Sequence, residues 1–135
     1  MGQVYSNFSH INYEELQTKV KRGSTIVLLN TLSSENQSYL IKGTLKATYE
    51  ISIMNDYLKK NKNIEIIIYG KDHHDTTVIK KYNQLKKLGF KNVSIYFGGL
   101  FEWSLLQDIY GFSNFETDGQ IKDPLQISKF TPLKI

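Results

Sequence analysis

The chain has 135 residues and contains no cysteine. This absence excludes disulfide bonds, thiolate metal sites and every reaction that needs a cysteine nucleophile. The sequence also has no apolar run close to the roughly 20 residues that a membrane-spanning helix requires, and no hydrophobic stretch typical of a secretion signal. These absences favour an intracellular, cytoplasmic protein.

Proline is scarce as well, and both prolines, Pro124 and Pro132, lie near the C-terminus. The hydrophobic fraction of 40% is typical of a folded globular protein, and the length suffices for one domain but not for two. We therefore divide the chain into an N-terminal segment of residues 1–10, a domain of residues 11–111 and an extended C-terminal tail of residues 112–135. The tail is too short to build its own core, so we expect it to lie on a partner or, alternatively, to wrap its own domain.

Short apolar segments alternate with amphipathic segments throughout the predicted domain. Their periodicity predicts strands at residues 25–30, 64–68 and 93–96 and helices at residues 11–20, 50–60, 76–88 and 100–110. Alternation of this kind is typical of a three-layer α/β fold, in which helices cover both faces of a parallel sheet, here of about five strands. Asn12 is predicted to cap the first helix, and Gly23 to end it in the left-handed conformation.

The segment Ile64 to Asp75, IEIIIYGKDHHD, is the centre of this predicted fold. Four of its first five residues are isoleucine, which suits a strand that is buried on both faces. Gly70 allows a sharp turn after the strand, and Asp75 or Thr76 can cap the next helix. Because ligands in open parallel sheets bind at the carboxyl ends of strands, the loop that follows this strand is the predicted site.

The second half of the chain resembles a rhodanese-like domain. Members of that family commonly have a helix ending in L-x-x-x-G-F-x-N-V, then a short strand, then G-G and an aromatic helix. The matching residues are Leu85, Gly89, Phe90, Asn92, Val93, Gly98, Gly99 and Trp103. The first half matches more loosely: Ile11 to Leu16 resembles the I-S-x-E-E-L opening, but Asn30-Thr31-Leu32 stands where the family usually has D-x-R. The segments LLNTL, LIKGT and GGLFEWSLLQDIYG further resemble a cysteine-poor branch of protists and large DNA viruses.

In active rhodaneses, and in phosphatases of the same fold, the loop after the central strand carries a cysteine that accepts sulfur or phosphoryl. The resemblance therefore assigns the former active site to one loop, which consists of Gly70, Lys71, Asp72, His73, His74, Asp75 and Thr76. None of these residues can form a persulfide, so sulfurtransferase and cysteine-phosphatase chemistry are excluded. The loop is also longer than in typical active members, and His73 is only a near match to the position of the nucleophile.

Other roles for this loop remain open. We expect no metal or cofactor, because the adjacent histidines His73 and His74 can hardly ligate one ion without strain. A histidine that accepts phosphate would need an activating carboxylate, which Asp72 or Asp75 could supply. The backbone N–H groups could bind a small anion together with Lys71. The simplest interpretation is a polar loop that caps the following helix.

Two further features suggest contacts with other molecules. No acidic residue lies between Asp75 and Glu102, and the lysines of this stretch form a predicted basic surface: Lys80, Lys81, Lys86, Lys87 and Lys91. The first residues, MGQVYS, fit the N-myristoylation pattern, so Gly2 is a candidate lipidation site, and a membrane contact is expected only if Gly2 is acylated. No aromatic and basic strand pattern typical of RNA-binding modules occurs, so no nucleic acid partner is expected.

The sequence therefore predicts a non-catalytic rhodanese-like domain that acts as a protein-binding or structural module. A cytoskeletal or ciliary assembly is one candidate setting, because cysteine-lacking rhodanese-like domains resemble components found there. One alternative is a hydrolase or transferase with a cysteine-free site at Gly70 to Thr76. The other is a myristoylated membrane-surface adaptor.

Overall fold

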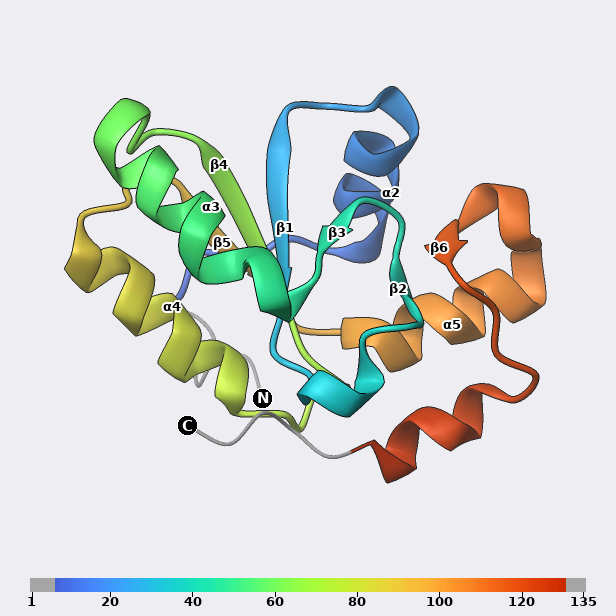
Figure 1. Cartoon of the computed structure of the whole chain (residues 1–135). Coiled ribbons are helices and arrows are strands. Elements are labelled where there is room, and N and C mark those ends of the chain that lie inside the picture. The colour runs from blue at the N-terminus through green and yellow to red at the C-terminus, as the bar shows by residue number, and fades with distance from the viewer. Residues whose placement is uncertain (1–6, 131–135) are drawn as a thin grey trace.

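A parallel β-sheet between two pairs of helices forms the body of the molecule (Figure 1). The computed structural model describes residues 7–130. The strands of the sheet are β1 (Ile26–Asn30), β3 (Thr44–Leu45), β4 (Glu65–Tyr69) and β5 (Val93–Tyr96), in the order β3-β1-β4-β5. The helices are α2 (Tyr13–Arg22), α3 (Ala47–Lys60), α4 (Thr77–Leu88) and α5 (Gly99–Tyr110). The predicted α/β architecture is confirmed.

The sheet of the described residues has four strands, where about five were expected. In place of a further strand, the N-terminal segment runs beside β5 and forms one isolated parallel bridge between His10 and Ile95. Two backbone hydrogen bonds hold it there, from Ile11 N to the Ile95 carbonyl at 3.0 Å and from Ile95 N to the Ser9 carbonyl at 2.9 Å.

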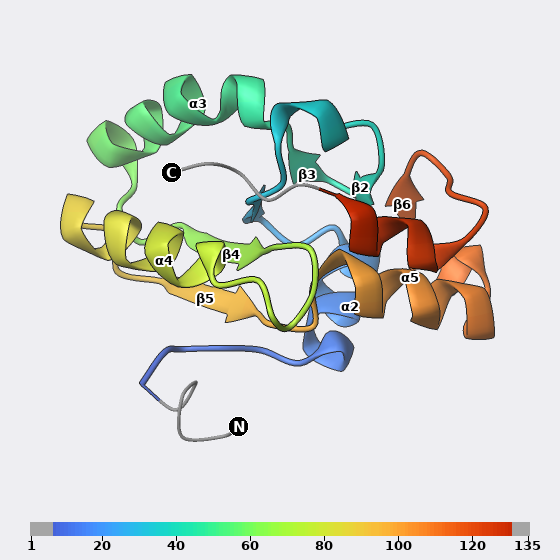
Figure 2. The ribbon, with the colours of Figure 1, turned by 90° about the horizontal axis from the view of Figure 1, so that it is seen from below.

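The central strand β4 is buried on both faces, as its isoleucines predict. Ile67 and Tyr69 pack into one hydrophobic cluster with residues of α2 and α5, whereas Ile66 and Ile68 pack into a second cluster with residues of α3 and α4. This alternation follows from the two-residue period of a strand, whose successive side chains point to opposite faces. Figure 2 shows α3 and α4 separated from α2 and α5 by the sheet.

Local sequence signals fix the limits of the first helix. The side chain of Asn12 accepts a hydrogen bond from Glu15 N at 2.9 Å, and the Glu15 carboxylate accepts one from Asn12 N at 3.3 Å. This reciprocal pair is a capping box, which satisfies two N–H groups that the helix itself cannot. At the other end, Gly23 has φ 63°, a left-handed conformation that glycine adopts at little cost. Both predictions for α2 are confirmed.

The prediction of an extended tail is wrong for the part of it that the structure describes. This part contains η2 (Phe112–Asn114), β6 (Thr117–Asp118) and η3 (Pro124–Lys129), and β6 pairs antiparallel with β2 (Leu40–Ile41). Phe115 and Ile127 are buried in the same cluster as α2 and α5, and Trp103 Nε1 donates a hydrogen bond to the Glu116 carbonyl at 3.0 Å. The tail therefore covers its own domain, because its few large apolar side chains find a place against α5.

Two predictions concern the membrane. No helix within residues 7–130 is long and apolar enough to span a bilayer. The candidate lipidation site, Gly2, lies outside the described residues.

Candidate functional site

The loop of residues 70–76 connects the carboxyl end of β4 to the start of α4, as the sequence suggests. Since β4 lies between β1 and β5, the loop stands at the middle of the sheet edge. Six of the surrounding residues line a hollow of about 220 Å³: Lys71, Asp72, His74, Asp75, Thr76 and Thr77. The predicted site is therefore a hollow in the protein surface, and its chemistry depends on which groups face the inside of the loop.

The carboxylate of Asp75 turns into the loop and occupies it. Its Oδ2 accepts a hydrogen bond from Lys71 N at 2.9 Å, and its Oδ1 accepts bonds from Thr77 N at 3.0 Å and from the Thr77 hydroxyl at 2.6 Å. Asp75 is only 8% exposed. Thr76 makes no side-chain capping bond, so Asp75, the first of the two predicted caps, fills this role. Backbone N–H groups that would hold a bound anion already hold this carboxylate.

Gly70 is the residue that makes room for this carboxylate. A Cβ atom at position 70 would lie 2.4 Å from Asp75 Oδ2 and 2.9 Å from the Thr31 hydroxyl oxygen, far inside van der Waals contact. The sequence suggested that Gly70 serves a sharp turn, but Gly70 is not among the glycines with positive φ. Lack of space, and not backbone conformation, therefore requires glycine here, and no side chain fits directly after β4 while Asp75 points inward.

The start of α5 anchors the loop from the other side. Leu100 N donates to the Gly70 carbonyl at 3.0 Å, and Phe101 N donates to the Lys71 carbonyl at 2.9 Å. This approach needs Gly99, because a Cβ atom there would lie 2.8 Å from the Gly70 carbonyl oxygen, and because its φ is 72°. Gly99 therefore lets the start of α5 approach the backbone of the loop. The first N–H groups of α5, which have no partner within the helix, therefore bind loop carbonyls of the same protein, as the N–H groups around Asp75 bind its carboxylate.

The rings of the two adjacent histidines lie against each other at the surface, tilted by 40°. The ring centroids of His73 and His74 are 3.9 Å apart, and both residues are exposed. Asp72 Oδ1 accepts a hydrogen bond from His74 N at 3.0 Å, which closes a local turn. His10 lies elsewhere, with its ring next to that of Phe97. In the described part of the chain, no three acidic or histidine side chains are grouped so that they could hold a metal ion.

Two threonines at this site escaped the sequence analysis. Thr31 is fully buried at the end of β1, and its hydroxyl oxygen lies 2.7 Å from that of Thr77. Thr77 in turn donates to Asp75, so the three residues form one hydrogen-bonded chain from β1 to α4. The only signal in the sequence was the departure from D-x-R, because Asn30 and Leu32 stand at the places of the acid and the arginine, with Thr31 between them. Two uncharged residues therefore replace the usual acid and arginine.

Asn30, next to Thr31, makes a separate set of hydrogen bonds that reaches α3. Its side chain exchanges two hydrogen bonds with the Gln37 amide, at 3.0 and 2.9 Å, and accepts one from Leu32 N at 3.0 Å. Gln37 also accepts a bond from Ala47 N at 2.9 Å, at the start of α3. The Asn30 and Gln37 amides therefore find their hydrogen-bond partners inside the protein and need no charged group or ligand.

Two buried tyrosines support the strands below the loop. The Tyr69 hydroxyl accepts a hydrogen bond from Ile41 N at 3.1 Å and lies 2.7 Å from the Thr44 hydroxyl, so it ties β4 to β2 and β3. Burial raises the pKa of Tyr69 well above its usual range. The Tyr96 hydroxyl donates to Glu102 at 2.6 Å, and burial, followed by this acidic neighbour, raises the pKa of Tyr96. Both phenols therefore stay neutral and act as structural groups.

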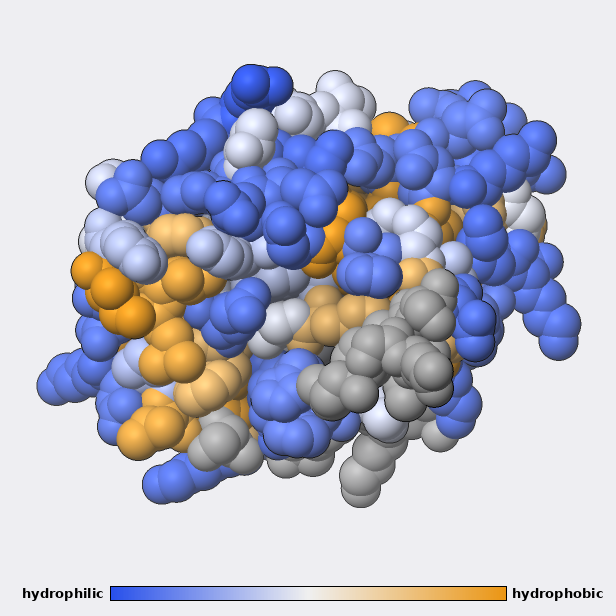
Figure 3. Space-filling model, turned by 180° about the vertical axis from the view of Figure 1, so that it is seen from behind, coloured by the Kyte–Doolittle hydropathy of each residue, from blue (hydrophilic) through white to orange (hydrophobic). Residues whose placement is uncertain are grey.

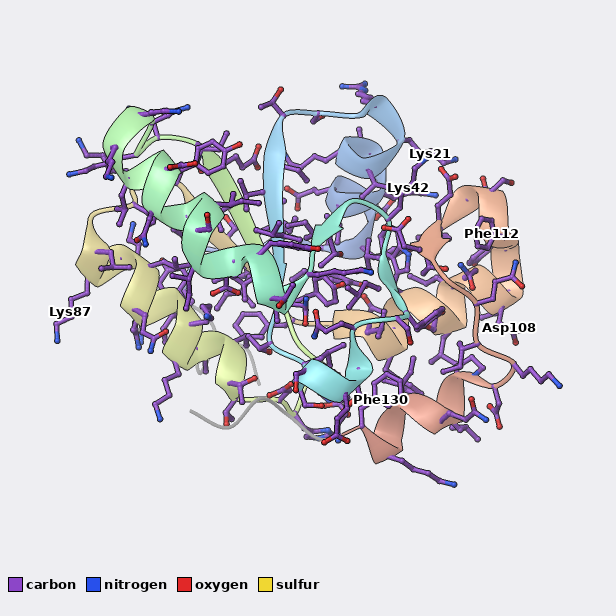
Figure 4. The ribbon with its side chains drawn as sticks, in the orientation of Figure 1. Lys21, Lys42, Lys87, Asp108, Phe112 and Phe130 are labelled. Atoms are coloured by element: carbon purple, nitrogen blue, oxygen red, sulfur yellow. The ribbon has the colours of Figure 1, made fainter. Side chains whose placement is uncertain are left out.

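The predicted basic surface is divided by the structure. Lys81 forms an ion pair with Glu50 of α3, and the two side chains are only 12% and 15% exposed. Lys81 therefore joins two helices, and for the other lysines the basic surface stays a prediction. Lys86 reaches the Lys91 carbonyl at 3.4 Å, whereas Lys87 points away from the protein (Figure 4).

The tail reaches the former active site. Lys71 Nζ donates to the Phe130 carbonyl at 3.4 Å, and Figure 4 shows Phe130 at the same end of the molecule as the loop. A separate feature is the apolar outer side of α5, where Leu105 and Ile109 are 37% and 70% exposed, one turn apart. Figure 3 shows hydrophobic residues gathered on that side of the molecule.

Solved structures share this fold. The Alr3790 protein from Anabaena sp. has a TM-score of 0.61 at 24% identity, over 86% of this chain and 97% of its own. The BH2092 protein from Bacillus halodurans has a TM-score of 0.62 at 17% identity, over 87% of this chain and 81% of its own. A thiosulfate sulfurtransferase from Pseudomonas aeruginosa has a TM-score of 0.62 at 14% identity, over 98% of this chain but only 23% of its own.

Among curated proteins, none is significantly similar to the chain. The profile of the rhodanese-like domain family matches residues 29–106, which is more than half of the sequence. This match includes the end of β1, the whole of β4, the loop of residues 70–76 and the Gly98-Gly99 pair. The chain therefore belongs to the rhodanese-like domain family, and it does so without any cysteine to carry the family's sulfur.

Proposed function

We propose that this protein is a non-catalytic rhodanese-like module that binds a protein partner or holds a place in a larger assembly. The observation that carries the proposal is the inward Asp75 carboxylate. It uses the N–H groups of Lys71 and Thr77 and lies where a side chain at position 70 would have to be. A loop that has no thiolate, and whose N–H groups at Lys71 and Thr77 already bind its own acid, presents a negative charge to a substrate anion in place of free donors at those two positions.

The same argument weakens the prediction that the loop binds a small anion. A second negative charge close to Asp75 would be repelled, and it would have to displace three existing hydrogen bonds. Of the contact surfaces that the sequence suggests, the outer part of the loop with His73 and His74 and the exposed lysines of α4 still face solvent. A cytoskeletal or ciliary setting, a cytoplasmic location, acylation of Gly2 and the resemblance to a protist and viral branch stay predictions.

The experiment for this proposal measures turnover with purified full-length protein. Thiosulfate with cyanide tests sulfur transfer, and phosphate esters test hydrolysis by a cysteine-free site. His73→Ala is the diagnostic variant, and His10→Ala, which removes a histidine elsewhere in the fold, is its matched control. We expect no turnover above the buffer rate for any of the three proteins. Turnover that His73→Ala abolishes and His10→Ala preserves would establish the enzyme alternative instead.

A further inference from the structure

The sheet has an incomplete edge beside β1. Its neighbour on that side, β3, has two residues and pairs only with Leu28 and Leu29. On the other side, β4 pairs with β1 along its whole length, from Ile26 to Asn30. Among the described residues, the first half of β1 therefore has a strand partner on one side only. Unpaired strand edges offer backbone groups to which another extended chain can add.

The direction of the backbone groups at this edge follows from the register. Thr31 N donates to the Tyr69 carbonyl on β4. Because successive residues of a strand direct their N–H and C=O groups to opposite sides, Val27 and Leu29 also face β4, whereas Ile26 and Leu28 face the β3 side. Leu28 meets β3 there. The N–H and C=O groups of Ile26 therefore face the open edge.

A hollow lies on each face of the sheet at this edge. The larger one, of about 420 Å³, lies on the side of α3, where Tyr49, Ile53 and Tyr57 line it. The smaller one, of about 190 Å³, lies on the side of α2, where Lys19 and Val20 line it. Ile26, Leu28 and Gly43 border both hollows. A strand added at Ile26 would place its alternate side chains into one hollow and then the other.

The two hollows differ in chemistry. The α3 side offers two tyrosines and an isoleucine, with Lys46 as its one charged residue, so it mainly suits apolar side chains. The α2 side carries Lys19 and Lys42, and no acidic residue lines either hollow. Both lysines are paired, with Glu65 at 2.9 Å and with Glu116 at 3.3 Å, but these pairs are partly exposed to solvent. Exposed pairs contribute little, so a carboxylate of the partner can replace Glu65 or Glu116 as the counter-ion of a lysine at small cost.

We infer that β1 accepts an extended segment of a partner protein, in which apolar residues alternate with acidic residues. The segment hydrogen-bonds to Ile26, directs its apolar side chains to the tyrosines of α3 and its carboxylates to the lysines beside α2. A second copy of this chain is a poor occupant, because its net charge is +4 and its own edge carries the same lysines. This inference rests on the proposed function and names where the partner binds.

The test uses the full-length protein, labelled with ¹⁵N, and two synthetic hexapeptides as probes. One alternates valine with aspartate, and the other alternates valine with lysine. We expect the acidic peptide to shift the amide signals of Ile26 and Gly43, and the basic peptide to leave them unchanged. Equal shifts with both peptides, or shifts confined to residues away from this edge, would overturn the inference.

Two variants separate the backbone contact from the charge contact. Ile26→Pro removes one N–H group at the first residue of a strand, where proline is tolerated, and we expect about a tenfold loss of affinity for the acidic peptide. Lys42→Glu should weaken binding about fivefold or more, while its control Lys87→Glu, on the far side of the molecule, should not (Figure 4). If Ile26→Pro does not fold, the comparison of Lys42→Glu with Lys87→Glu tests the inference by itself. Equal affinities of the two glutamate variants contradict the inference.

The outcome for the edge is independent of the outcome for the loop. If the protein binds neither peptide and turns over no substrate, this inference is refuted but the proposed function is not. Turnover at the loop would refute the proposed function, whatever the peptides do. Dimerisation of the free protein that Ile26→Pro abolishes would assign the edge to a second copy and overturn the inference of a partner segment.

Discussion

Gly70 and Asp75 should depend on each other for stability, and a double-mutant cycle measures this dependence. In the wild-type protein, Gly70→Ala would place a methyl group 2.4 Å from Asp75 Oδ2 and 2.9 Å from Asp75 Cγ. Either the carboxylate or the backbone must move, which would break the bonds to Lys71 and Thr77. Overpacking of this kind costs about 1–3 kcal/mol of the free energy of unfolding.

Asp75→Ala by itself should lower the free energy of unfolding at least as much as Gly70→Ala does. It removes a helix cap, worth about 1 kcal/mol, and leaves the partly buried N–H groups of Lys71 and Thr77 without this acceptor, which adds about 1 kcal/mol, the lower end of the penalty for a buried group. In the double variant, however, two of the three closest contacts of the new methyl group no longer exist. Gly70→Ala should then cost at least about 1 kcal/mol less than it does in the wild type, which is a coupling within the range measured for neighbouring residues.

Urea unfolding provides the measurement, because Trp103 is the only tryptophan and is fully buried, so its fluorescence reports the loss of the core. Thr76→Ala is the matched control: it changes the neighbouring residue, which makes no capping bond, and should cost less than about 0.5 kcal/mol. If the two single effects add within about 0.5 kcal/mol, the carboxylate does not occupy the space at Gly70 and the reasoning fails.

Two further predictions concern the tail and the buried phenols. Ile127→Ala should lower the free energy of unfolding by about 2–4 kcal/mol, because Ile127 is completely buried, while Lys129→Ala, an exposed change in the same helix, should have little effect in the same urea assay. Equal small effects would mean that the tail is not part of the core. Burial raises the pKa of Tyr39, Tyr69 and Tyr96, so above about pH 10 the unfolded chain loses protons that the folded chain keeps, and stability should fall as the pH rises from there. The urea concentration at the midpoint of unfolding, measured between pH 8 and pH 11, checks this expected fall. A midpoint that stays constant or rises with pH would contradict it.

Part of this protein could be derived from its sequence because the signals are local. The isoleucines of β4 predict a strand buried on both faces, since hydrophobic burial depends on side-chain type and on the two-residue period. The capping box of α2 involves residues three apart, so it is visible in the sequence itself. The lack of cysteine excludes persulfide chemistry for any fold of this chain, because no arrangement of other side chains supplies a thiolate sulfur.

Only the tertiary structure decided how the site is filled. That Asp75 turns inward depends on Thr31, 44 residues earlier in the chain, and on the start of α5, which holds the loop from the other side. The burial of Ile127 against α5 and the pairing of Lys81 with Glu50 depend on distant elements in the same way. Contacts between residues far apart in sequence leave no periodic pattern, because their energy arises only when the chain has brought the surfaces together.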